Sequence, residues 1–542
     1  MILASVVFAF ASFLIGCQGI QPAPPAGGGN GGGGGNGGGG GTTPAPTASL
    51  TADPATLVAG QPTTLTWTTT NATTITIDGG VGTVAANGSM QVTPANTITY
   101  HLTATGAGGT KDALAAVTVN APPPTSLQSI NHIVFMLQEN RSLDSYLGNL
   151  PQYWQAQGIQ NPPQFDGLPA NTSNPSFDGT TTIPSFHLKS VCFSDLSPSW
   201  NESHADWNLH SPTSSTPMMD GFATTAAKYA RNNANDDIEG FRAMGYYTDA
   251  DLNFYYDLAT KFAISDRWFS PVLSRTPPNR QYLMAATSAG HVYASGPLSN
   301  KTIFQALEEA GVSWRVYESD PNSSYFRGFQ PFSTQHANNI VDASQFAQDA
   351  ASGNLPAVAM IDGGYASGRD EHPNNNVQTG AAYVESFVTA LMNSPSWKDS
   401  AFILTFDEGG GTYDHVPPQP AVNPEGCNDI ATTACHPIDL KPGDTCSNPG
   451  ANCSFNYTGY RIPLVVISPF SKKNYVSHTV ADTTAILKFI ETRFGLQPLT
   501  QRDAAQIDMT EFFDFPNQPA YLTPPPLVQQ KTGTLCDFDQ LQ

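Results

Sequence analysis

The sequence is poor in basic residues. Only 23 of its 542 residues are Lys or Arg, against 44 Asp or Glu, so the formal net charge is −21 at pH 7 and the pI is near 4.7. A protein that holds nucleic acid by general attraction to its phosphates needs a basic surface, and this composition argues against one. For the same reason, charge alone does not draw the chain to an anionic bilayer.

A hydrophobic run long enough to span a bilayer is missing from the start of the chain. Residues 1–16 are apolar or small, too few to cross a membrane and typical of a cleaved signal peptide. They lead into Leu14-Ile-Gly-Cys17, which resembles a bacterial lipobox. That resemblance implies lipidation of Cys17 and an exported protein tethered at the cell envelope; a plain secretory peptide is the alternative.

Cysteine is also scarce, and most of it is clustered. After Cys17 six cysteines remain: Cys192, Cys427, Cys435, Cys446, Cys453 and Cys536. Four of them fall in residues 425–454, which are rich in Asn, Thr and Pro and have few apolar residues, so we expect disulfides to hold this insertion together. A zinc knuckle that includes His436 is the rival interpretation, but the irregular cysteine spacing argues against it.

The first part of the chain divides by composition. Residues 17–46 are rich in Gly, Asn and Pro and predict a flexible tether. Residues 47–121 contain short alternating runs between turn residues, which predicts an antiparallel β-sandwich. Trp67 on an early strand and Tyr100 on a late one resemble the core of an immunoglobulin-like domain. Residues 122–127 form a Pro-rich linker.

The second part, residues 128–515, is long enough for one large core and is followed by a tail, residues 516–542. Apolar runs typical of buried parallel strands stand at 132–137, 357–361, 402–406 and 463–467. Apolar residues recur at helical spacing over 377–391 and 486–494, the latter with Asp482 as N-cap and Gly495 beyond its end. This alternation predicts an α/β domain with a mainly parallel sheet.

Acidic and amide side chains follow these strands at the carboxyl edge, where such folds bind ligands. Glu139 and Asn140 follow the first, and Asp407 and Glu408 follow the third. Adjacent acids at a strand end are costly unless they are solvated or neutralised. Their hard oxygens, together with the hydroxyl of Thr276, predict one divalent-metal site; a solvated loop is the alternative.

The stretch 265–280 supplies the candidate nucleophile, Thr276. Pro277 and Pro278 restrict the backbone, so we expect Thr276 in an extended or turn conformation just before a helix. Arg280 offers a planar charged fork suited to two phosphate oxygens. A proline-rich loop with a solvated arginine is the alternative.

Four histidines lie in polar segments: His204, His372, His415 and His478. Imidazole can protonate a leaving oxygen or bind a phosphoryl group. For His204 and His372 we favour a catalytic role over that of a hydrogen-bonded loop histidine, and for His415 and His478 both roles stay open.

Six separated motifs carry a resemblance: His132-Ile-Val-Phe-Met-Leu-Gln-Glu-Asn-Arg-Ser142, Met244-Gly-Tyr-Tyr-Thr-Asp249, Asp266-Arg-Trp-Phe269, Thr276-Pro-Pro-Asn-Arg280, Phe406-Asp-Glu-Gly-Gly410 with Asp414-His-Val-Pro-Pro418, and Gly459-Tyr-Arg-Ile-Pro463 with Ile467-Ser-Pro469. The chain resembles the bacterial phosphoesterase family of non-haemolytic phospholipases C and acid phosphatase A enzymes.

This resemblance implies an alkaline-phosphatase-like fold and assigns the site. By it, Glu139, Asn140, Asp407 and Glu408 are metal ligands, Thr276 is the nucleophile, and His204 and His372 are active-site histidines. Asp414, His415 and His478 are candidates for supporting or substrate-contacting positions. Thr276-x-Pro278-x-Arg280 also resembles the nucleophile pattern of sulfatases. A sulfatase is disfavoured, because Thr cannot be oxidised to the aldehyde that sulfatases need.

The predicted chemistry is hydrolysis of a phosphate ester through a phospho-threonine intermediate. Choline recognition needs aromatic faces, and nine aromatic residues flank His204 and Thr276: Trp200, Trp207, Tyr246, Tyr247, Phe254, Tyr255, Tyr256, Trp268 and Phe269. We expect most of the nine to lie in the core, but two or three turned toward the site would make a cage. We therefore favour phospholipase C-type cleavage of phospholipid head groups over acid phosphatase action on monoesters. A more remote alternative is a non-catalytic surface protein that binds through the β-sandwich.

Overall fold

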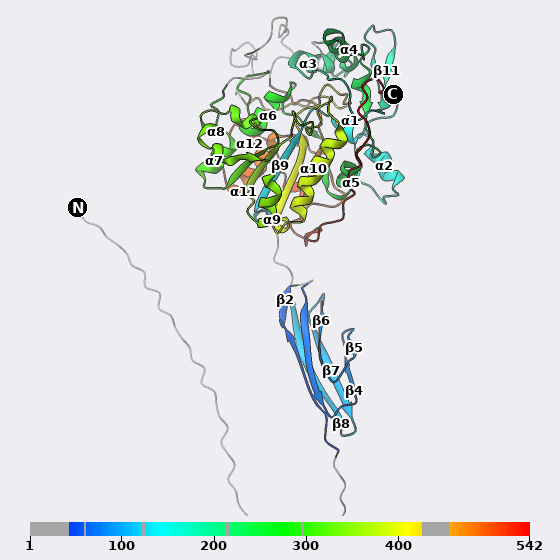
Figure 1. Cartoon of the computed structure of the whole chain (residues 1–542), viewed down its shortest axis with the longest axis vertical. Coiled ribbons are helices and arrows are strands. Elements are labelled where there is room, and N and C mark those ends of the chain that lie inside the picture. The colour runs from blue at the N-terminus through cyan, green and yellow to red at the C-terminus, as the bar shows by residue number, and fades with distance from the viewer. Residues whose placement is uncertain are drawn as a thin grey trace, which may run out of the picture. The chain divides into compact units, whose positions relative to one another are not determined.

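The computed structural model describes residues 43–58, 61–120, 126–212, 214, 216–293, 297–424, 439 and 455–542. The predicted signal peptide, Cys17 and the four clustered cysteines lie outside the described residues, so these expectations stay predictions. The chain forms two compact units, residues 1–122 and 123–542 (Figure 1).

The first unit consists of two β-sheets. Its strands are β1 (Thr47–Asp53), β2 (Thr56–Val58), β3 (Thr63–Thr70), β4 (Thr74–Ile77), β5 (Gly82–Thr83), β6 (Asn87–Val92), β7 (Ile98–Gly106) and β8 (Gly109–Asn120). One sheet has the order β1-β3-β6 and the other β2-β8-β7-β4-β5. Trp67 and Tyr100 are both buried between apolar neighbours. The alternating pattern of Thr, Val and Ala therefore does form strands, and the immunoglobulin likeness stays an interpretation.

The second unit is built on an eight-stranded sheet in the order β17-β16-β18-β9-β19-β20-β14-β21. These strands are β9 (His132–Gln138), β14 (Ala263–Ser265), β16 (Trp314–Glu318), β17 (Ile340–Asp342), β18 (Val358–Asp362), β19 (Ser400–Phe406), β20 (Leu464–Ile467) and β21 (Val476–Ser477). The strands β17, β16, β18, β9 and β19 are parallel, but β20 runs antiparallel to both β19 and β14. The prediction that 463–467 is a parallel strand was wrong in direction.

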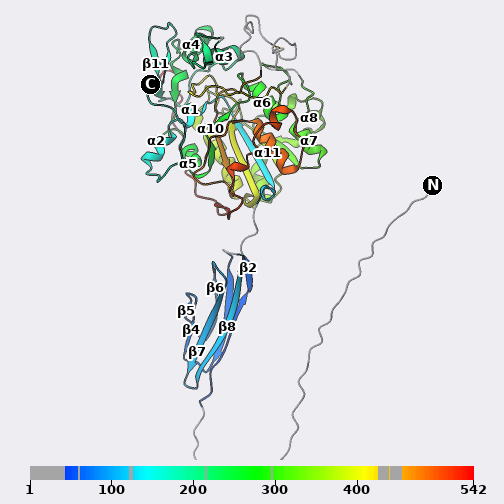
Figure 2. The same ribbon diagram turned by 180° about the vertical axis from the view of Figure 1, so that it is seen from behind.

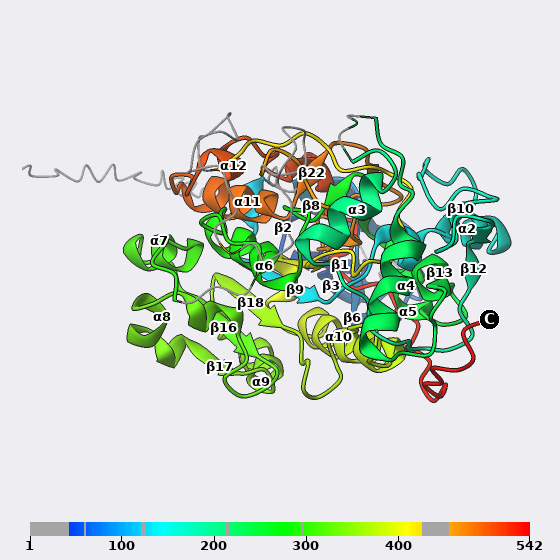
Figure 3. The same ribbon diagram turned by 90° about the horizontal axis from the view of Figure 1, so that it is seen from above.

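Helices lie on both sides of this sheet. Seen from above, α9 (Gln345–Ser352) and α10 (Val377–Met392) lie on one side of the central strands, and α11 (Thr484–Phe494) and α12 (Gln501–Ala504) on the other (Figure 3). In Figure 2, which views the protein from behind, α11 lies on the viewer's side of the strands. A mixed sheet between helical layers confirms the α/β prediction.

The remaining elements surround this core. The helices are α1 (Leu143–Leu147), α2 (Leu150–Ala156), α3 (Trp200–Asn208), α4 (Phe222–Asn233), α5 (Asn253–Lys261), α6 (Thr276–Ala285), α7 (Ile303–Glu309) and α8 (Phe332–Gln335). The short strands are β10 (Ser173–Pro175), β11 (Thr182–Pro184), β12 (Phe186–His187), β13 (Gly245–Tyr246), β15 (Trp268–Phe269) and β22 (Ala481–Asp482). In the part of the chain with described coordinates, no helix has the length and apolar character to cross a bilayer.

Two helix starts differ from expectation. The N-cap of α11 is Thr483, and Asp482 instead accepts hydrogen bonds from the backbone N–H and hydroxyl of Thr484. Helix α6 begins at Thr276 itself, because Pro277 and Pro278 occupy the first turn, where a missing N–H costs nothing. The end of α11 is as predicted, with Gly495 in the left-handed conformation at φ 68°.

The C-terminal tail is fixed to the second unit without regular secondary structure. Cys536 forms a disulfide with Cys192. Gln530 is buried and donates from Nε2 to the carbonyl of Asp251, and the backbone N–H of Asp537 donates to Ser190 Oγ. The sequence did not predict this pairing, because cysteine spacing alone leaves connectivity open.

Stability should depend on pH through Glu491 of α11, which is buried beside Asp503. Burial, and then the hydrogen bond and charge of Asp503, raise the pKa of Glu491 to about 8 from an ordinary value of 4.5. The folded protein then retains a proton that the unfolded chain releases between pH 4.5 and 8, so the free energy of unfolding falls as pH rises, by up to about 1.4 kcal/mol per pH unit.

We expect Glu491→Gln to unfold at a higher temperature than the unmodified protein at pH 8, and at a similar temperature at pH 4.5. Thermal unfolding at both pH values measures this difference. The exposed Glu309→Gln is the charge-matched control and should leave the pH dependence in place. An unchanged pH dependence in Glu491→Gln would contradict the prediction.

Candidate active site

The carboxyl ends of β9 and β19 and the start of α6 meet at one place. Gln138 at the end of β9 pairs with Phe406 at the end of β19, so the residues that follow each strand lie side by side. Asn140 takes a left-handed backbone conformation, φ 65°, which Asn tolerates better than most residues, and its N–H donates to Asp407 Oδ1 over 3.1 Å. Gly410 lies so close that a Cβ there would stand 2.2 Å from the carbonyl oxygen of Asn140.

The side-chain amide of Asn140 is the centre of the site. One of its terminal atoms lies 2.9 Å from Glu408 Oε1, 3.2 Å from Asp407 Oδ1 and 3.2 Å from Thr276 Oγ1. The other lies 2.9 Å from His372 Nε2. Hydrogen bonding among protein atoms alone favours the amide nitrogen toward the three oxygens. The opposite orientation gathers four oxygens, from Asn140, Asp407, Glu408 and Thr276, which is a donor set that a hard divalent cation takes.

Charge at this place also fits a cation. Burial and neighbouring carboxylates raise the pKa of Glu408 and of Glu139 well above the ordinary range. Burial likewise raises the pKa of Asp407, although the Arg280 guanidinium opposes this effect. Buried carboxylates without enough positive charge are destabilising unless they are protonated or bound to a metal. The residues present therefore fit a divalent ion held by Asn140, Asp407, Glu408 and Thr276. Glu139, which was also predicted as a ligand, instead pairs with Arg280 over 3.0 Å.

Arg280 does not offer an open fork for phosphate. Its Nη2 lies 3.0 Å from Glu139 Oε1, its Nη1 2.9 Å from Asp362 Oδ1 and its Nε 3.5 Å from Asp407 Oδ2. The guanidinium also lies 5.0 Å from the ring centre of Tyr325. Arg280 therefore does not make the predicted contact with phosphate. It pairs instead with acids at the carboxyl ends of three strands and neutralises part of their charge.

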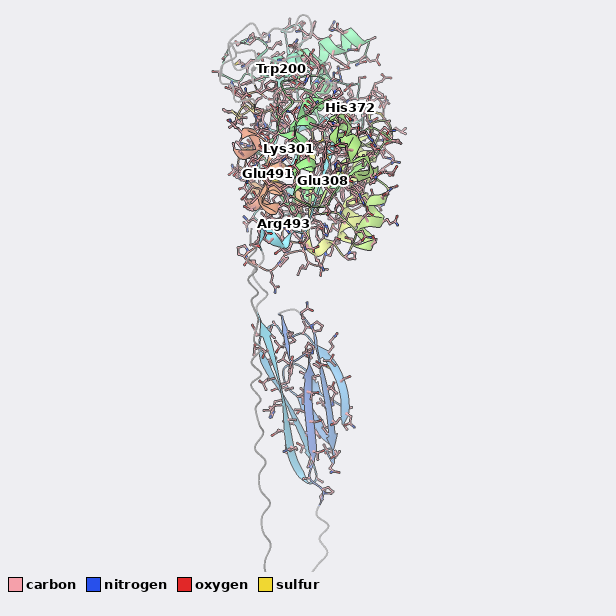
Figure 4. All side chains as sticks on the ribbon, turned by 90° about the vertical axis from the view of Figure 1, so that its left-hand side faces the viewer. Trp200, Lys301, Glu308, His372, Glu491 and Arg493 are labelled. Atoms are coloured by element: carbon pink, nitrogen blue, oxygen red, sulfur yellow. A yellow bond between two sulfur atoms is a disulfide. The ribbon has the colours of Figure 1, made fainter. Side chains whose placement is uncertain are left out.

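His372 lies next to the oxygen cluster. Its Nε2 faces Asn140, its Nδ1 lies 3.0 Å from Asn374 Oδ1 and 3.6 Å from Asp195 Oδ1, and its ring meets Tyr365 edge to face at 5.3 Å. Figure 4 shows His372 nearer the end of the unit that carries Trp200 than the end that carries Arg493. The structure thus brings His372 together with Thr276, as the sequence predicted.

His204 lies elsewhere. Its ring packs on Trp200 with ring centres 4.4 Å apart, and its Nδ1 lies 2.6 Å from the Trp200 carbonyl oxygen one helical turn earlier in α3. Burial lowers the pKa of His204 to about 4, so the ring is neutral near pH 7. His204 lines neither of the cavity lobes described below, so the structure does not bring it together with Thr276 as the sequence predicted.

Asp414 and His415 belong to a buried ion network rather than to the oxygen cluster, and His478 lies outside both. Arg461 donates to Asp414 Oδ1 over 2.8 Å and to Asp144 Oδ1 over 2.9 Å, and His415 Nδ1 lies 2.7 Å from Asp144 Oδ2. His478, half-exposed, contacts Asp266 over 2.8 Å.

Ligand atoms of Asp144, Asp414 and His415 lie within 4.8 Å of one another, so these three could by geometry hold a metal ion. Arg461 already supplies a positive charge between the two acids. The network joins the segments that follow β9 and β19, which makes these residues supports of the site.

The cavity above Thr276 has two lobes. The first, the Tyr325 lobe, has a volume of about 370 Å³ and is lined by Glu139, Asp195, Arg275, Thr276, Pro277, Arg280, Ser323, Tyr325, Asp362, Gly363, Tyr365 and His372. The second, the Glu202 lobe, has about 390 Å³ and is lined by Asn140, Asp195, Leu196, Ser197, Pro198, Ser199, Asn201, Glu202, Tyr229, Arg275, Thr276, Tyr293 and His372. Thr276, Arg275, Asp195 and His372 line both lobes, so they form the junction.

Most of the nine aromatic residues lie in the core, as expected, and none of them forms the predicted cage. Trp200, Trp207, Tyr247, Phe254, Tyr255, Tyr256, Trp268 and Phe269 are buried, Tyr246 is half-buried, and none of the nine lines either lobe. The aromatic side chains that do line the lobes are Tyr325, Tyr365, Tyr229 and Tyr293. Arg275 was also missed, although its place beside Thr276 in the chain was a sufficient signal.

The chain is similar to a known protein family and to several known phospholipases C. Residues 130–497 match the model of the phosphoesterase family. Phospholipase C B of Mycobacterium tuberculosis is 31% identical over 450 residues, which cover 73% of this chain and 80% of that protein. Non-specific phospholipase C1 of Arabidopsis thaliana is 29% identical over 445 residues, 76% of each chain. Non-hemolytic phospholipase C of Burkholderia pseudomallei is 28% identical over 423 residues, 68% of this chain and 56% of that one.

Proposed function

Because the chain belongs to the phosphoesterase family and is a hydrolase of phosphoric ester bonds, we propose that it cleaves phospholipid head-group phosphodiesters in the manner of a phospholipase C. The observation that carries the proposal is the cavity: the hydroxyl of Thr276 lies at the junction of two lobes of similar volume. A phosphodiester has two alcohol arms, and such a cavity can take one on each side of the phosphorus.

Side chains of this protein account for each step of the proposed hydrolysis. Thr276 Oγ attacks phosphorus as its proton passes to the Asp407 carboxylate, and one alcohol is displaced, which leaves a phospho-threonine ester. Asp407 forms a hydrogen bond with the Thr276 hydroxyl and is the neighbouring carboxylate. His372 lines both lobes and is placed to protonate the departing alcohol, and Arg275 is the cation at the junction that can face the phosphoryl oxygens. Water then hydrolyses the phospho-threonine and restores Thr276.

A divalent ion bound by Asn140, Asp407 and Glu408 would lower the pKa of the hydroxyl and offset charge on the phosphoryl oxygens. Arg280 holds Glu139 and Asp362 in place beside this site and offsets part of their negative charge.

Acid phosphatase action on monoesters is the second candidate function. A monoester has a single alcohol arm and would leave one lobe unused. Purified protein should therefore hydrolyse p-nitrophenyl phosphorylcholine and phosphatidylcholine faster than p-nitrophenyl phosphate. If p-nitrophenyl phosphate is cleaved far faster and phosphatidylcholine not at all, the acid phosphatase reading replaces this one.

Export and lipid anchoring complete the proposal. The Leu14-Ile-Gly-Cys17 sequence supports lipidation of Cys17, which would hold the enzyme near a membrane that contains its substrate. Mass spectrometry of the mature N-terminus tests this: a lipidated Cys17 supports the anchor, and an unmodified N-terminus overturns it.

We expect Asp407→Asn to lose bound divalent metal before it loses structure, because the amide keeps the shape of the carboxylate and removes its charge. Elemental analysis of the purified protein, with a thermal unfolding curve alongside, measures both. Asp362→Asn is the matched control, since Asp362 also pairs with Arg280 but lies outside the oxygen cluster around Asn140. Full metal content in Asp407→Asn would show that the ion lies elsewhere.

A further inference from the structure

The two lobes of the cavity differ in whether each of their acidic side chains has a cationic partner. In the Tyr325 lobe, Glu139 and Asp362 are both paired with Arg280, at 3.0 Å and 2.9 Å. The ring of Tyr325 faces the same guanidinium. Both acids at this end of the cavity therefore have a cationic partner in the protein, and a positively charged ligand group would have to compete with Arg280 for them.

In the Glu202 lobe an acid remains without a partner. Glu202 stands in the first turn of α3 and makes no ion pair and no side-chain hydrogen bond with any residue that the structure describes. Asp195, the second acid of this lobe, lies 3.6 Å from His372 at the junction. Among the described residues that line the lobe, Arg275 is the only Lys or Arg; it also lines the other lobe and lies beside Thr276, where the anionic phosphoryl group reacts.

Two aromatic side chains complete the lining of this lobe. Tyr229 comes from α4 and Tyr293 from the segment after α6. Burial and the nearby Asp195 carboxylate raise the pKa of Tyr229, so the ring stays neutral and its hydroxyl lies near an acid. Neutral aromatic faces next to carboxylates are the surroundings that bind an ammonium group, including one whose methyl groups prevent hydrogen bonding.

We propose that the Glu202 lobe binds the positively charged head group of the substrate, an ammonium or trimethylammonium group, through Glu202, Asp195, Tyr229 and Tyr293. This assignment rests on the proposed phosphodiesterase function and names the charge class of its substrate. The phosphorus then lies at Thr276 and the other alcohol arm enters the Tyr325 lobe. The net charge of the lobe, rather than the overall charge of the protein, selects the head group.

The test compares two diesters that differ in charge: p-nitrophenyl phosphorylcholine, which carries the cation, and bis(p-nitrophenyl) phosphate, which does not. Glu202→Gln should lower kcat/KM for the choline ester about tenfold, mainly through KM, because a carboxylate opposite a partly desolvated cation contributes about 1.4 kcal/mol. For bis(p-nitrophenyl) phosphate, kcat/KM of the variant should differ from that of the unmodified protein by less than about twofold. Glu239→Gln, a surface acid that lines neither lobe, is the charge-matched control.

A second measurement uses the unmodified protein. Choline should inhibit cleavage of bis(p-nitrophenyl) phosphate, and its neutral isostere 3,3-dimethyl-1-butanol should inhibit at least about tenfold more weakly if charge is recognised. Equal inhibition by both compounds, or equal loss on both diesters in Glu202→Gln, overturns the head-group assignment while the proposed function stands. If the unmodified protein cleaves neither diester, the proposed function itself fails, and this assignment with it.

Discussion

Replacing Thr276 by Ala is expected to lower turnover of any accepted phosphate ester by at least about 1,000-fold while the protein stays folded. Thr276 Oγ1 lies 3.2 Å from the Asn140 amide and opens onto both lobes of the cavity. The hydroxyl is the attacking group in the proposed chemistry, so no neighbouring side chain can replace it. The measurement is steady-state kinetics on p-nitrophenyl phosphorylcholine.

Folding should survive this change because Thr276 stands at the first turn of α6, which Pro277 and Pro278 already favour. Thermal unfolding within a few degrees of the unmodified protein checks this point. Thr276→Ser is the matched control: it keeps the hydroxyl, and we expect it to retain measurable turnover. Activity in Thr276→Ala equal to that of the unmodified protein would remove Thr276 from the mechanism.

A trapped intermediate gives independent evidence for the same residue. If the phospho-threonine forms, rapid acid quench during turnover should leave a phosphoryl or phosphorylcholine group on the peptide that contains Thr276, and mass spectrometry would detect its added mass. The Thr276→Ala protein should carry none. Modification at a different residue would reassign the nucleophile while leaving the hydrolase activity itself untouched.

The sequence predicted the backbone of the site well because the relevant patterns are local. Continuous apolar runs marked β9, β18 and β19, and their parallel alignment placed Glu139, Asn140, Asp407 and Glu408 at one edge of the sheet. Helical spacing likewise marked α10 and α11. The direction of β20 was missed, because a buried run of apolar residues has the same pattern whichever way the strand runs.

The partners of charged side chains could not be predicted in this way. Arg280 was assigned to phosphate because a guanidinium suits phosphate and carboxylate alike. The choice between them depends on Glu139 and Asp362, which lie 141 and 82 residues away in the chain. The lining of the two lobes was missed for a related reason. Tyr325 begins a single short 3-10 turn, Tyr325–Gly328, and Tyr293 stands in an irregular segment, so no periodic pattern reveals the position of either.

Removing the charge of Arg280 should have the largest effect on stability. Its side chain is 3% exposed and its guanidinium contacts Glu139, Asp362 and Asp407. Arg280→Met keeps much of the apolar volume but leaves three buried carboxylates without their shared cation, and breaking such a buried ion pair costs about 3–5 kcal/mol. Chemical denaturation near pH 7, monitored by circular dichroism, measures the loss.

The pH dependence of Arg280→Met separates lost charge balance from lost packing. Burial already raises the pKa of Asp362 and of Glu139, and the arginine opposes that shift in both. Without it their pKa values in the folded protein rise further, so the folded state binds protons that the unfolded chain has released. The free energy of unfolding of the variant, relative to the unmodified protein, should therefore recover as the pH falls from 7 toward 5. A deficit that stays constant over this range would mean that packing, and not charge, is what Arg280 contributes.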